Sequence, residues 1–463
     1  MPDSPHQRAL EALLSGRVVS DDALLASHSV DWGGENDCMP SLLVRPETTE
    51  ELSVLLAYCH EHRQPIAVQG GLTGLSGGAT PQQGEIAVSL EKMNGIIELD
   101  QSSMTLTAWA GTPLQVIQQT AKEVDMQFPL DLGARGSCTI GGNVSTNAGG
   151  NQVLNYGMTR ALVLGIEAVL ADGTVVSHLN KMLKNNAGYD LKQLFIGSEG
   201  TLGIVTKVVL RVFPAARSRQ TAFCAFNSFS SAVSFLRTMQ QRLPSVTAFE
   251  LMWDNYISAV LPLCEELNFP LRERYPYYVL IESEGGDPER DRRGFEKALS
   301  DELEAEALRD AVVAQSLTEI ESLWAIRDAV SEMLTVVKHR ANFDIGVPIS
   351  RMEEFVAEVK QTLNGQFANL HMPTFGHVAD SNIHIIAWTD NPDDVEPIYL
   401  EVYKMIQRYN GTITAEHGIG VMKSKYLNYC RSSDEIALMQ TLKAALDPHN
   451  ILNPGRVAGI RAD

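Results

Sequence analysis

A glycine-rich stretch, QGGLTGLSGGAT at residues 69–80, constrains the fold of this chain more than any other feature. Neither a helix nor a strand tolerates five glycines in so short a span, because each adds backbone freedom that must be lost on folding. Apolar runs flank the stretch at 65–68 and 86–90, and both are typical of strands. The pattern predicts a tight loop whose backbone N–H groups converge on an anion such as a phosphate, with a plain cluster of turns as the alternative.

Two further glycine-rich segments follow, DLGARGSCTIGGNVSTNAGG at 131–150 and GSEGTLG at 197–203. Neither matches the G-x-G-x-x-G dinucleotide fingerprint between a strand and a helix, and the first stretch lacks the lysine of a P-loop. Three separated segments of this kind predict a long ligand that the backbone contacts along its length.

Composition limits the class of protein. The 463 residues allow two or three domains, and 44% hydrophobic with 20% charged residues is ordinary for a globular chain. A formal net charge of -20 argues against a nucleic-acid partner. No apolar run reaches the roughly 18 residues of a membrane span, and the first residues, MPDSPHQRALEALLSG, contain no signal-peptide core. We therefore expect a cytoplasmic protein.

The six cysteines are scattered, without any C-x-x-C spacing. This excludes an in-chain iron–sulfur cluster or zinc ribbon built from a local motif, and it predicts buried free thiols.

The order of the expected elements suggests three parts. Strands and short helices alternate between 66 and 212, so residues 1–215 form an α+β domain. In residues 216–420, two β-α-β patterns predict a ferredoxin-like sheet, followed by one long helix at 316–338. The last part, residues 421–463, is a small helical segment.

Two histidines and an acidic pair are the candidates for chemistry. His377 and His384 lie in FGHVADSNIHI, and Glu416 and His417 lie in TAEHGIG. Two imidazoles and one carboxylate form a donor set that leaves positions open on a divalent ion. From the residues alone, histidines with satisfied hydrogen bonds in a core or on a surface are the more frequent case.

Several longer motifs carry a resemblance that covers nearly the whole chain, from about Val30 onward. GGLTGLSGGA, TIGGNVSTNAGG, YDLKQLFIGSEGTLGIVT and LNPGRV resemble the FAD-linked oxidase family of vanillyl-alcohol-oxidase type. More narrowly they resemble its 2-hydroxy-acid dehydrogenase branch, which includes D-lactate dehydrogenase, the glycolate oxidase flavin subunit and D-2-hydroxyglutarate dehydrogenase. The resemblance implies an α+β fold: an FAD-binding domain, a ferredoxin-like antiparallel cap domain, and a small helical C-terminal segment that returns to the flavin.

The same resemblance implies the flavin contacts. FAD is expected to bind non-covalently, because the first loop contains no histidine for a covalent link and Cys138 lacks a linkage motif. The family often has an arginine before the first glycines, where this chain has Gln69. The implied contacts are Gly70, Gly71, Thr73, Gly74, Ser76, Gly142, Asn143, Ser145, Thr146, Gly150, Glu199, Gly200, Ile204 and Asn453.

The family motifs G-H-x-G-D-G-N-x-H and A-E-H-G imply that His377, His384 and Glu416 hold a divalent metal, zinc first, with manganese or iron as alternatives. They imply that His417 is the general base and contacts the substrate. This chain has ADSN in place of GDGN, which reduces the backbone freedom of that loop.

The family's W-x-x-R pattern matches Trp324 and Arg327 and implies that Arg327 clamps the substrate carboxylate, with Ser331 beside it. The hydroxyglutarate branch has lysine where this chain has Asn342 and asparagine where it has Ile386. These two losses leave one firm cation, Arg327, for one substrate carboxylate.

The implied activity is the FAD- and metal-dependent oxidation of a 2-hydroxy acid, D-lactate or a D-configured relative, to the 2-oxo acid by hydride transfer to FAD. Electrons then pass to an external acceptor: an electron-transfer flavoprotein, a quinone, a cytochrome or an iron–sulfur partner. A flavin oxidase of another alcohol using oxygen and a flavin subunit with a degenerate site are the alternatives. The oligomeric state is open, with a homodimer among the options.

Overall fold

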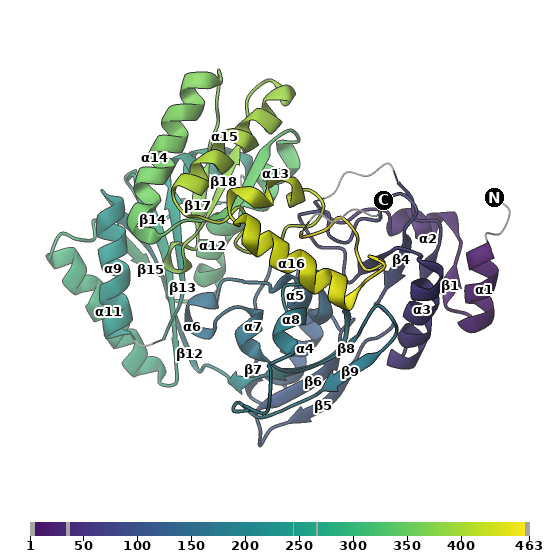
Figure 1. Cartoon of the computed structure of the whole chain (residues 1–463). Coiled ribbons are helices and arrows are strands. Elements are labelled where there is room, and N and C mark those ends of the chain that lie inside the picture. The colour runs from purple at the N-terminus through teal and green to yellow at the C-terminus, as the bar shows by residue number, and fades with distance from the viewer. Residues whose placement is uncertain (1–4, 34–37, 244, 265–266, 459–463) are drawn as a thin grey trace. The chain divides into compact units, whose positions relative to one another are not determined.

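A computed structural model describes residues 5–33, 38–243, 245–264 and 267–458, and these form two compact units (Figure 1). The first unit takes the described residues of 1–150, 157–215 and 416–463, and the second takes those of 151–156 and 216–415. The second unit is therefore inserted into the sequence of the first. The described residues after 415 belong to the first unit, so the expected C-terminal segment is not a third body, and residues 416–420 fall outside the second unit.

The first sheet of the first unit contains the strands on either side of the glycine-rich stretch. Its order is β1-β2-β4-β3, and β2, β4 and β3 run parallel. Parallel neighbours need a crossover connection, so residues 70–85 form an extended crossover and not the expected tight loop. The elements are α1 (Pro5–Leu13), β1 (Val18–Val19), α2 (Asp22–Ser27), β2 (Leu43–Val44), α3 (Thr49–His62), β3 (Ile66–Gln69) and β4 (Ile86–Ser89).

The second sheet of this unit is antiparallel, in the order β5-β6-β10-β8-β9. The GGNV run, expected in a loop, lies in helix α5, where a Cβ at Gly141 would come within 2.6 Å of the Ala110 Cβ. Glycine thus permits close packing of the helix. The elements are β5 (Ile96–Asp100), β6 (Thr105–Trp109), α4 (Leu114–Lys122), β7 (Met126–Gln127), α5 (Ile140–Thr146), α7 (Thr159–Leu162), β8 (Val163–Val169), β9 (Val175–His178), α8 (Lys192–Phe195), β10 (Ile204–Arg211), β11 (Phe213–Pro214), η4 (Ser424–Tyr429) and α16 (Ser433–Leu446).

The second unit is built on one seven-stranded antiparallel sheet, ordered β15-β12-β14-β13-β17-β18-β16. The first four strands in this order, with α9 and α11, have the connectivity of a ferredoxin-like β-α-β-β-α-β fold, which confirms that prediction. Strands β17, β18 and β16 extend the sheet beyond β13. The elements are α6 (Val153–Tyr156), β12 (Ser218–Phe226), α9 (Phe229–Arg242), β13 (Val246–Trp253), α10 (Asp254–Val260), η1 (Leu261–Leu263), β14 (Tyr277–Gly285), α11 (Pro288–Glu304), β15 (Asp310–Val313), α12 (Leu317–Asp328), α13 (Val330–Val336), β16 (Ala341–Gly346), α14 (Ile349–Gln366), β17 (Thr374–Gly376), η2 (Val378–Asp380), β18 (Asn382–Ala387), η3 (Pro392–Asp394) and α15 (Val395–Arg408).

The single helix expected at 316–338 breaks at Ala329 into α12 and α13. The Tyr256 hydroxyl donates to the carbonyl oxygens of Ile326, at 3.1 Å, and Arg327, at 2.5 Å. In a continuous helix those two carbonyls would accept from the N–H groups four residues on. The buried tyrosine therefore ends α12 with Arg327 in its last turn.

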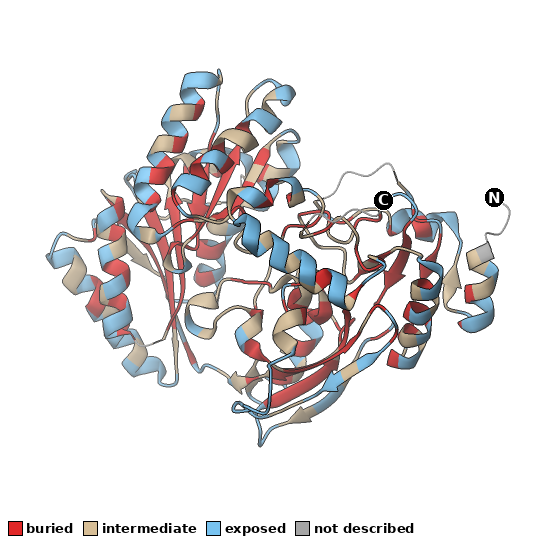
Figure 2. Ribbon diagram, viewed as in Figure 1, coloured by how far each residue is buried: buried red, intermediate tan, exposed pale blue. Residues whose placement is uncertain are grey.

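Burial follows the sheets. Figure 2 shows buried residues concentrated on the strands of both units, while α9, α11 and α14 carry exposed outer faces. Among the free cysteines, Cys59, Cys138 and Cys224 are buried and the other three are partly exposed. Within the described part of the chain, no helix has both the length and the apolar character needed to cross a membrane.

Candidate functional site

The first and second glycine-rich segments line one cavity of about 540 Å³ in the first unit. Gly70 and Gly71 come from the first segment, and Ser137 and Thr139 from the second. A Cβ at Gly71 would overlap the Ser137 carbonyl oxygen, so only glycine allows the two backbones to approach this closely. The remaining lining residues are His28, Leu72, Glu91, Asn94, Gly111, Pro113 and Val116.

Two buried polar atoms of the second segment have no hydrogen-bond partner within the described structure, Thr139 Oγ1 and Asn143 Oδ1. Their side chains are only 6% and 5% exposed. A buried polar atom left without a partner costs about 1–3 kcal/mol, so such atoms suit a bound polar ligand. A long polar cofactor such as FAD therefore fits the residues of this cavity.

Helix α5 carries the implied contacts Gly142, Asn143, Ser145 and Thr146. The Thr146 hydroxyl donates to the Gly142 carbonyl within the helix, and the Ser145 carbonyl accepts from the Glu199 N–H at 2.8 Å. The second and third glycine-rich segments are thereby tied together. Gly150 lies against the Asp131 carbonyl, where a Cβ would overlap it.

Gln69, which stands where the family often has arginine, is fully buried. Its Oε1 lies 2.8 Å from His28 Nδ1, and its Nε2 donates to the carbonyls of His28 and Ala79. This side chain therefore joins the start of the crossover to its middle. His28 lines the cavity, and no sequence motif had marked it.

The residues of the third segment are joined to the first strand by Asn453. Asn453 Oδ1 accepts from the Val68 N–H at 2.8 Å, and its Nδ2 donates to the Glu199 carbonyl at 2.7 Å. Gly200 adopts φ of +71°, in the left-handed region that favours glycine, and Ile204 begins β10. The side chain of Asn453 thus connects the third segment to β3, the strand that leads into the first segment.

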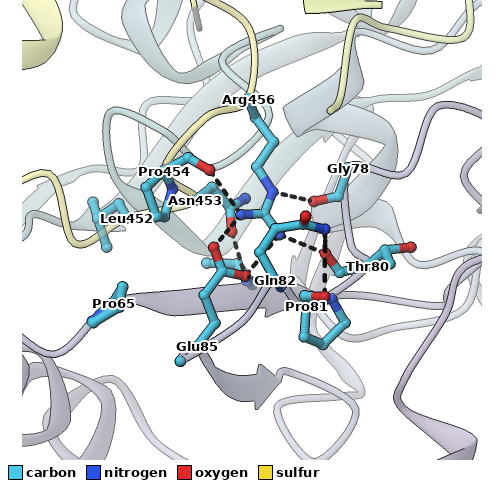
Figure 3. Close-up of polar contacts among 12 residues, drawn as sticks. Pro65, Gly78, Thr80, Pro81, Gln82, Glu85, Leu452, Asn453, Pro454 and Arg456 are labelled. Carbon is cyan, nitrogen blue, oxygen red and sulfur yellow. Dashed lines mark hydrogen bonds and ion pairs between the residues drawn. The ribbon is translucent and has the colours of Figure 1, made fainter. Parts of the chain in front are cut away.

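The end of the chain also clamps the crossover through Arg456, which is buried (Figure 3). Its guanidinium pairs with both carboxylate oxygens of Glu85 and donates to the carbonyls of Gly78 and Thr80. A fork paired with a carboxylate in this way is a strong, directional contact. The C-terminal segment therefore shapes the crossover that contains Thr73 and Gly74, both partly buried.

The loop that follows Glu416 and His417 rests on the cofactor segments of the first unit. The Glu199 carboxylate accepts from the N–H groups of Ile419, at 2.7 Å, and Gly420, at 2.8 Å. The Ser76 hydroxyl donates to the carbonyls of His417 and Gly418. The side chains of Glu199 and Ser76 therefore hold this loop.

One further observation places the loop close to the second segment. A Cβ at Gly149 would come within 2.8 Å of Glu416 Oε1. Burial raises the pKa of the Glu199 carboxyl, and the two backbone N–H groups oppose that rise. Glu416 and His417 thus follow a path set by all three glycine-rich segments.

In the second unit, Glu250 on β13 connects two predicted site residues. Its Oε1 lies 2.5 Å from Nδ1 of His377, and its Oε2 accepts from Nε of Arg327 at 3.0 Å. Glu250 is 1% exposed. Burial alone would raise its pKa, but the facing His377 and Arg327 lower it to about 2.

These contacts assign the tautomer of His377. A carboxylate only accepts, so Nδ1 carries the proton and donates to Glu250. A guanidinium only donates, so Nε2, which lies 3.1 Å from Arg327 Nη2, presents its lone pair. A neutral imidazole is the form that binds metals, and a metal ion at Nε2 would take the lone pair that accepts from Arg327 in this structure.

His384 lies beside His377 in the second unit. Their ring centroids are 5.6 Å apart, and ring nitrogens of the two residues lie within 4.8 Å of each other. Both side chains are buried, at 5% and 7% exposure. Two buried imidazoles at this separation suit one divalent ion.

The path of the chain links these histidines to Glu416. His384 on β18 is paired in register with Asp344 on β16, and Asp344 Oδ2 accepts from the N–H of Ala415 at 3.2 Å. Ala415 is the last residue of the second unit, and Glu416 follows it directly. Glu416, the third implied ligand, therefore directly follows a residue that is hydrogen-bonded to Asp344, the residue opposite His384 in the sheet.

Arg327 is held by its helix as well as by Glu250. Trp324 Nε1 donates to the buried Glu282 at 3.0 Å, which ties α12 to strand β14. Ser331 is exposed, and its hydroxyl donates to the Asp328 carbonyl in the turn between α12 and α13. The structure thus brings Arg327 to His377 and leaves Ser331 on the surface of this unit.

The ADSN loop between the histidines contains a strained residue. Ser381 adopts φ of +73°, the left-handed region, at a position where the family has glycine. Such a conformation costs an L-residue roughly 1–2 kcal/mol. The reduced freedom expected from the sequence therefore appears as strain at one residue.

The two departures from the hydroxyglutarate branch lie directly opposite each other, because Asn342 on β16 is paired in register with Ile386 on β18. Since side chains two residues apart on a strand share a face, this pair lies on the same face as Asp344 and His384. Ile386 is buried in an apolar cluster with Trp324, Phe375 and Met333.

The comparisons with known proteins agree with this architecture. The family "FAD linked oxidases, C-terminal domain" matches residues 215–457, and "FAD binding domain" matches residues 40–178. A mitochondrial D-2-hydroxyglutarate dehydrogenase of Danio rerio is 39% identical, over 96% of this chain and 83% of that protein. A D-2-hydroxyglutarate dehydrogenase of Xanthomonas citri is 35% identical, over 97% and 95%.

A third relative, from Schizosaccharomyces pombe, is provisionally named as a mitochondrial D-lactate dehydrogenase and is 34% identical, over 94% of this chain and 85% of that protein. The names of this relative and of the Danio rerio protein contradict the prediction of a cytoplasmic location, which was wrong.

Solved structures share the fold at low identity. p-Cresol methylhydroxylase with substrate bound has a TM-score of 0.78 at 18% identity, over 98% of this chain and 96% of that one. Alkyldihydroxyacetonephosphate synthase has a TM-score of 0.74 at 18% identity, over 96% and 84%. The fold predicted from the glycine-rich motifs is confirmed. The chain belongs to the FAD-linked oxidase family and is a flavin-dependent oxidoreductase.

Proposed function

We propose that this chain is an FAD-dependent dehydrogenase that oxidises a D-configured 2-hydroxy acid to the 2-oxo acid and passes the electrons to an external acceptor. The contact of Glu250 with both His377 and Arg327 carries this proposal, because it places a histidine in the metal-binding tautomer beside an arginine suited to a carboxylate. The names of the relatives, which act on 2-hydroxyglutarate or lactate, support the substrate class.

FAD is held non-covalently by the three glycine-rich segments. Burial raises the pKa of the Cys138 thiol, which disfavours the reactive thiolate beside the second segment. The cofactor, when bound, supplies the two-electron acceptor.

His377, His384 and Glu416 hold one divalent ion, with zinc as the first choice. Such an ion, when bound, lowers the pKa of a coordinated hydroxyl. His417 would take the proton of the substrate hydroxyl, and FAD, when bound, would accept the α-hydrogen as hydride, so that a C=O bond forms. Arg327 holds the substrate carboxylate through its guanidinium fork.

The side chain of the substrate is small or apolar. The Asn342–Ile386 pair lies on the His384 face of the sheet and offers no cation to a second carboxylate, whereas Arg327 serves the first. D-Lactate and its short homologues fit this arrangement. The names of the Danio rerio and Xanthomonas citri relatives favour D-2-hydroxyglutarate instead, which makes it the second candidate.

Anaerobic bleaching of the flavin absorbance tests the proposal. The substrates are D-lactate, L-lactate, D-2-hydroxybutyrate and D-2-hydroxyglutarate, each with and without prior chelation of metal. We expect the D-monocarboxylates to bleach fastest, L-lactate to be inert, and chelation to abolish bleaching without releasing flavin. Fastest bleaching by D-2-hydroxyglutarate would establish the second candidate, and no bleaching by any acid would refute the substrate class. Rapid reoxidation by oxygen would favour the oxidase alternative.

A further inference from the structure

Glu250 is a buried acidic residue that no sequence motif had marked. It lies on the central strand β13, in AFELMW, and reaches two side chains that come from distant parts of the second unit. Arg327 comes from the end of α12, and His377 from the end of β17. One carboxylate therefore orients both residues with separate oxygens, at 3.0 and 2.5 Å.

We propose that Glu250 is a positioning residue that couples binding of the divalent ion at His377 to binding of the substrate carboxylate at Arg327. The inference rests on the proposed function of these two residues and adds a third to them. It concerns only contacts within the second unit.

The first half of the coupling is the tautomer of His377. With Oε1 of Glu250 accepting from Nδ1, the lone pair is fixed on Nε2, and the ring cannot rotate without losing a buried hydrogen bond. A carboxylate behind a ligating histidine in this way raises its basicity, and removal of such partners weakens metal binding about 10- to 100-fold.

The second half is the orientation of Arg327. Oε2 of Glu250 takes the Nε–H, while Nη1 contacts Asp328 and Nη2 contacts His377, so each Nη group keeps a second N–H for a carboxylate. The Arg327 guanidinium also lies over the Phe375 ring, at 5.5 Å from its centroid. Loss of Glu250 would free the guanidinium plane to turn, because its remaining ion-pair partner, Asp328, has a largely exposed side chain.

The experiment compares Glu250→Gln, Glu250→Asp and a matched control, Glu282→Gln. Glu282 is also 1% exposed and lies one strand away on β14, where it binds Trp324 of the same helix. No contact of Glu282 with His377 or Arg327 occurs within the described residues. Thermal unfolding of each FAD-loaded variant separates lost stability from lost positioning.

Three quantities are measured on each protein: zinc affinity by competition with a chromophoric chelator, the Michaelis constant for D-lactate at saturating zinc, and the His377 tautomer by nitrogen-15 NMR of labelled histidine. We expect Glu250→Gln to weaken zinc binding about 10- to 100-fold and to raise the Michaelis constant at saturating zinc. The Nδ1–H tautomer signal should broaden or shift. Glu250→Asp should restore the tautomer partly, and Glu282→Gln should lower the melting temperature but leave the zinc affinity and the His377 tautomer at their wild-type values.

Two different failures are distinguishable. If wild-type protein and His377→Ala bind zinc equally, the proposed metal site is wrong and the coupling falls with it. If wild-type binds zinc through His377 but both Glu250 variants keep its zinc affinity and Michaelis constant, the proposed metal site stands and the coupling through Glu250 is refuted. If Glu250→Gln does not fold, the Glu250→Asp measurements decide between these outcomes.

Discussion

The two units build their sites from different materials. In the first unit, glycines let backbones meet, as at Gly71 against Ser137, and these segments line the proposed cofactor cavity. In the second unit, the proposed site is made of buried charged side chains, and Glu250 binds both His377 and Arg327. A long cofactor can be bound by backbone groups along its whole length. A small substrate needs a few side chains that each contact one of its atoms.

The largest effect on turnover should come from substituting the proposed general base, His417, and the proposed metal ligand, Glu416, one at a time. We expect His417→Asn to lose roughly two to four orders of magnitude in turnover while it keeps its metal, because a positioned base is worth that much. Glu416→Gln should lose metal and turnover together. Both variants should stay yellow. Metal analysis and single-turnover bleaching on the same samples check this, and equal metal loss in both variants would contradict the division of roles.

The proposed cofactor site in the first unit depends on close contact between backbones, so an added methyl group alone should weaken FAD binding. Gly71→Ala should weaken FAD binding about 10- to 100-fold, because the new methyl group overlaps the Ser137 carbonyl and forces the segments apart. The matched control is Gly133→Ala, at a glycine of the second segment with nothing within 4 Å of the added Cβ. Flavin fluorescence titration of the apoprotein measures both. Equal affinities in the two variants would show that the close approach is not needed.

The proposed site in the second unit depends on the geometry of its side chains, so it should lose activity when that geometry changes even though the charge is kept. Arg327→Lys replaces a two-pronged donor by a point charge, so kcat/KM for the preferred acid should fall by about 1–3 kcal/mol of transition-state binding. Arg340→Lys is the control, since Arg340 donates to the carbonyls of Leu334 and Val337 in the same unit. Wild-type efficiency in Arg327→Lys with every acid would place the carboxylate clamp elsewhere.

The smallest effect tests whether backbone shape matters in the second unit too. Ser381→Gly should raise the free energy of unfolding by about 0.5–1 kcal/mol, because it relieves a left-handed conformation. Ala379→Gly, the other position at which this loop departs from the family's glycines, should bring no gain, because Ala379 does not adopt positive φ. Chemical denaturation measures both. A gain from Ala379→Gly and none from Ser381→Gly would reverse this interpretation.

The same contrast explains which features the sequence could predict. Each glycine-rich segment is contiguous, so the residues alone predicted a long ligand, and the resemblance of these segments to a known family predicted the FAD-binding fold. The β-α-β-β-α-β order of the second unit followed from the periodicity of its strands. The break at Ala329 was not predictable, because a hydroxyl from Tyr256, far away in sequence, ends the helix.

Glu250 was missed for a similar reason. Its surroundings, AFELMW, resemble any buried strand, and the charge gains meaning only when α12 and β17 bring Arg327 and His377 to it. The contact of Gln69 with His28 is another example, because His28 lies in no motif and the contact joins separate segments. Contacts between residues distant in sequence leave no local pattern. A sequence therefore shows the residues that lie in motifs, such as His377, but not the residues that orient them, such as Glu250.

The clamp of Arg456 on Glu85 has a consequence for how the protein is made. Glu85 leaves the ribosome well before Arg456, because the described residues 216–415 of the second unit are translated between them. Until Arg456 emerges, Glu85 lacks the cation that neutralises it in the buried state, so the crossover cannot take its final form. The crossover therefore reaches its final form only after the inserted unit has been translated, so the first unit cannot fold segment by segment in the order of synthesis.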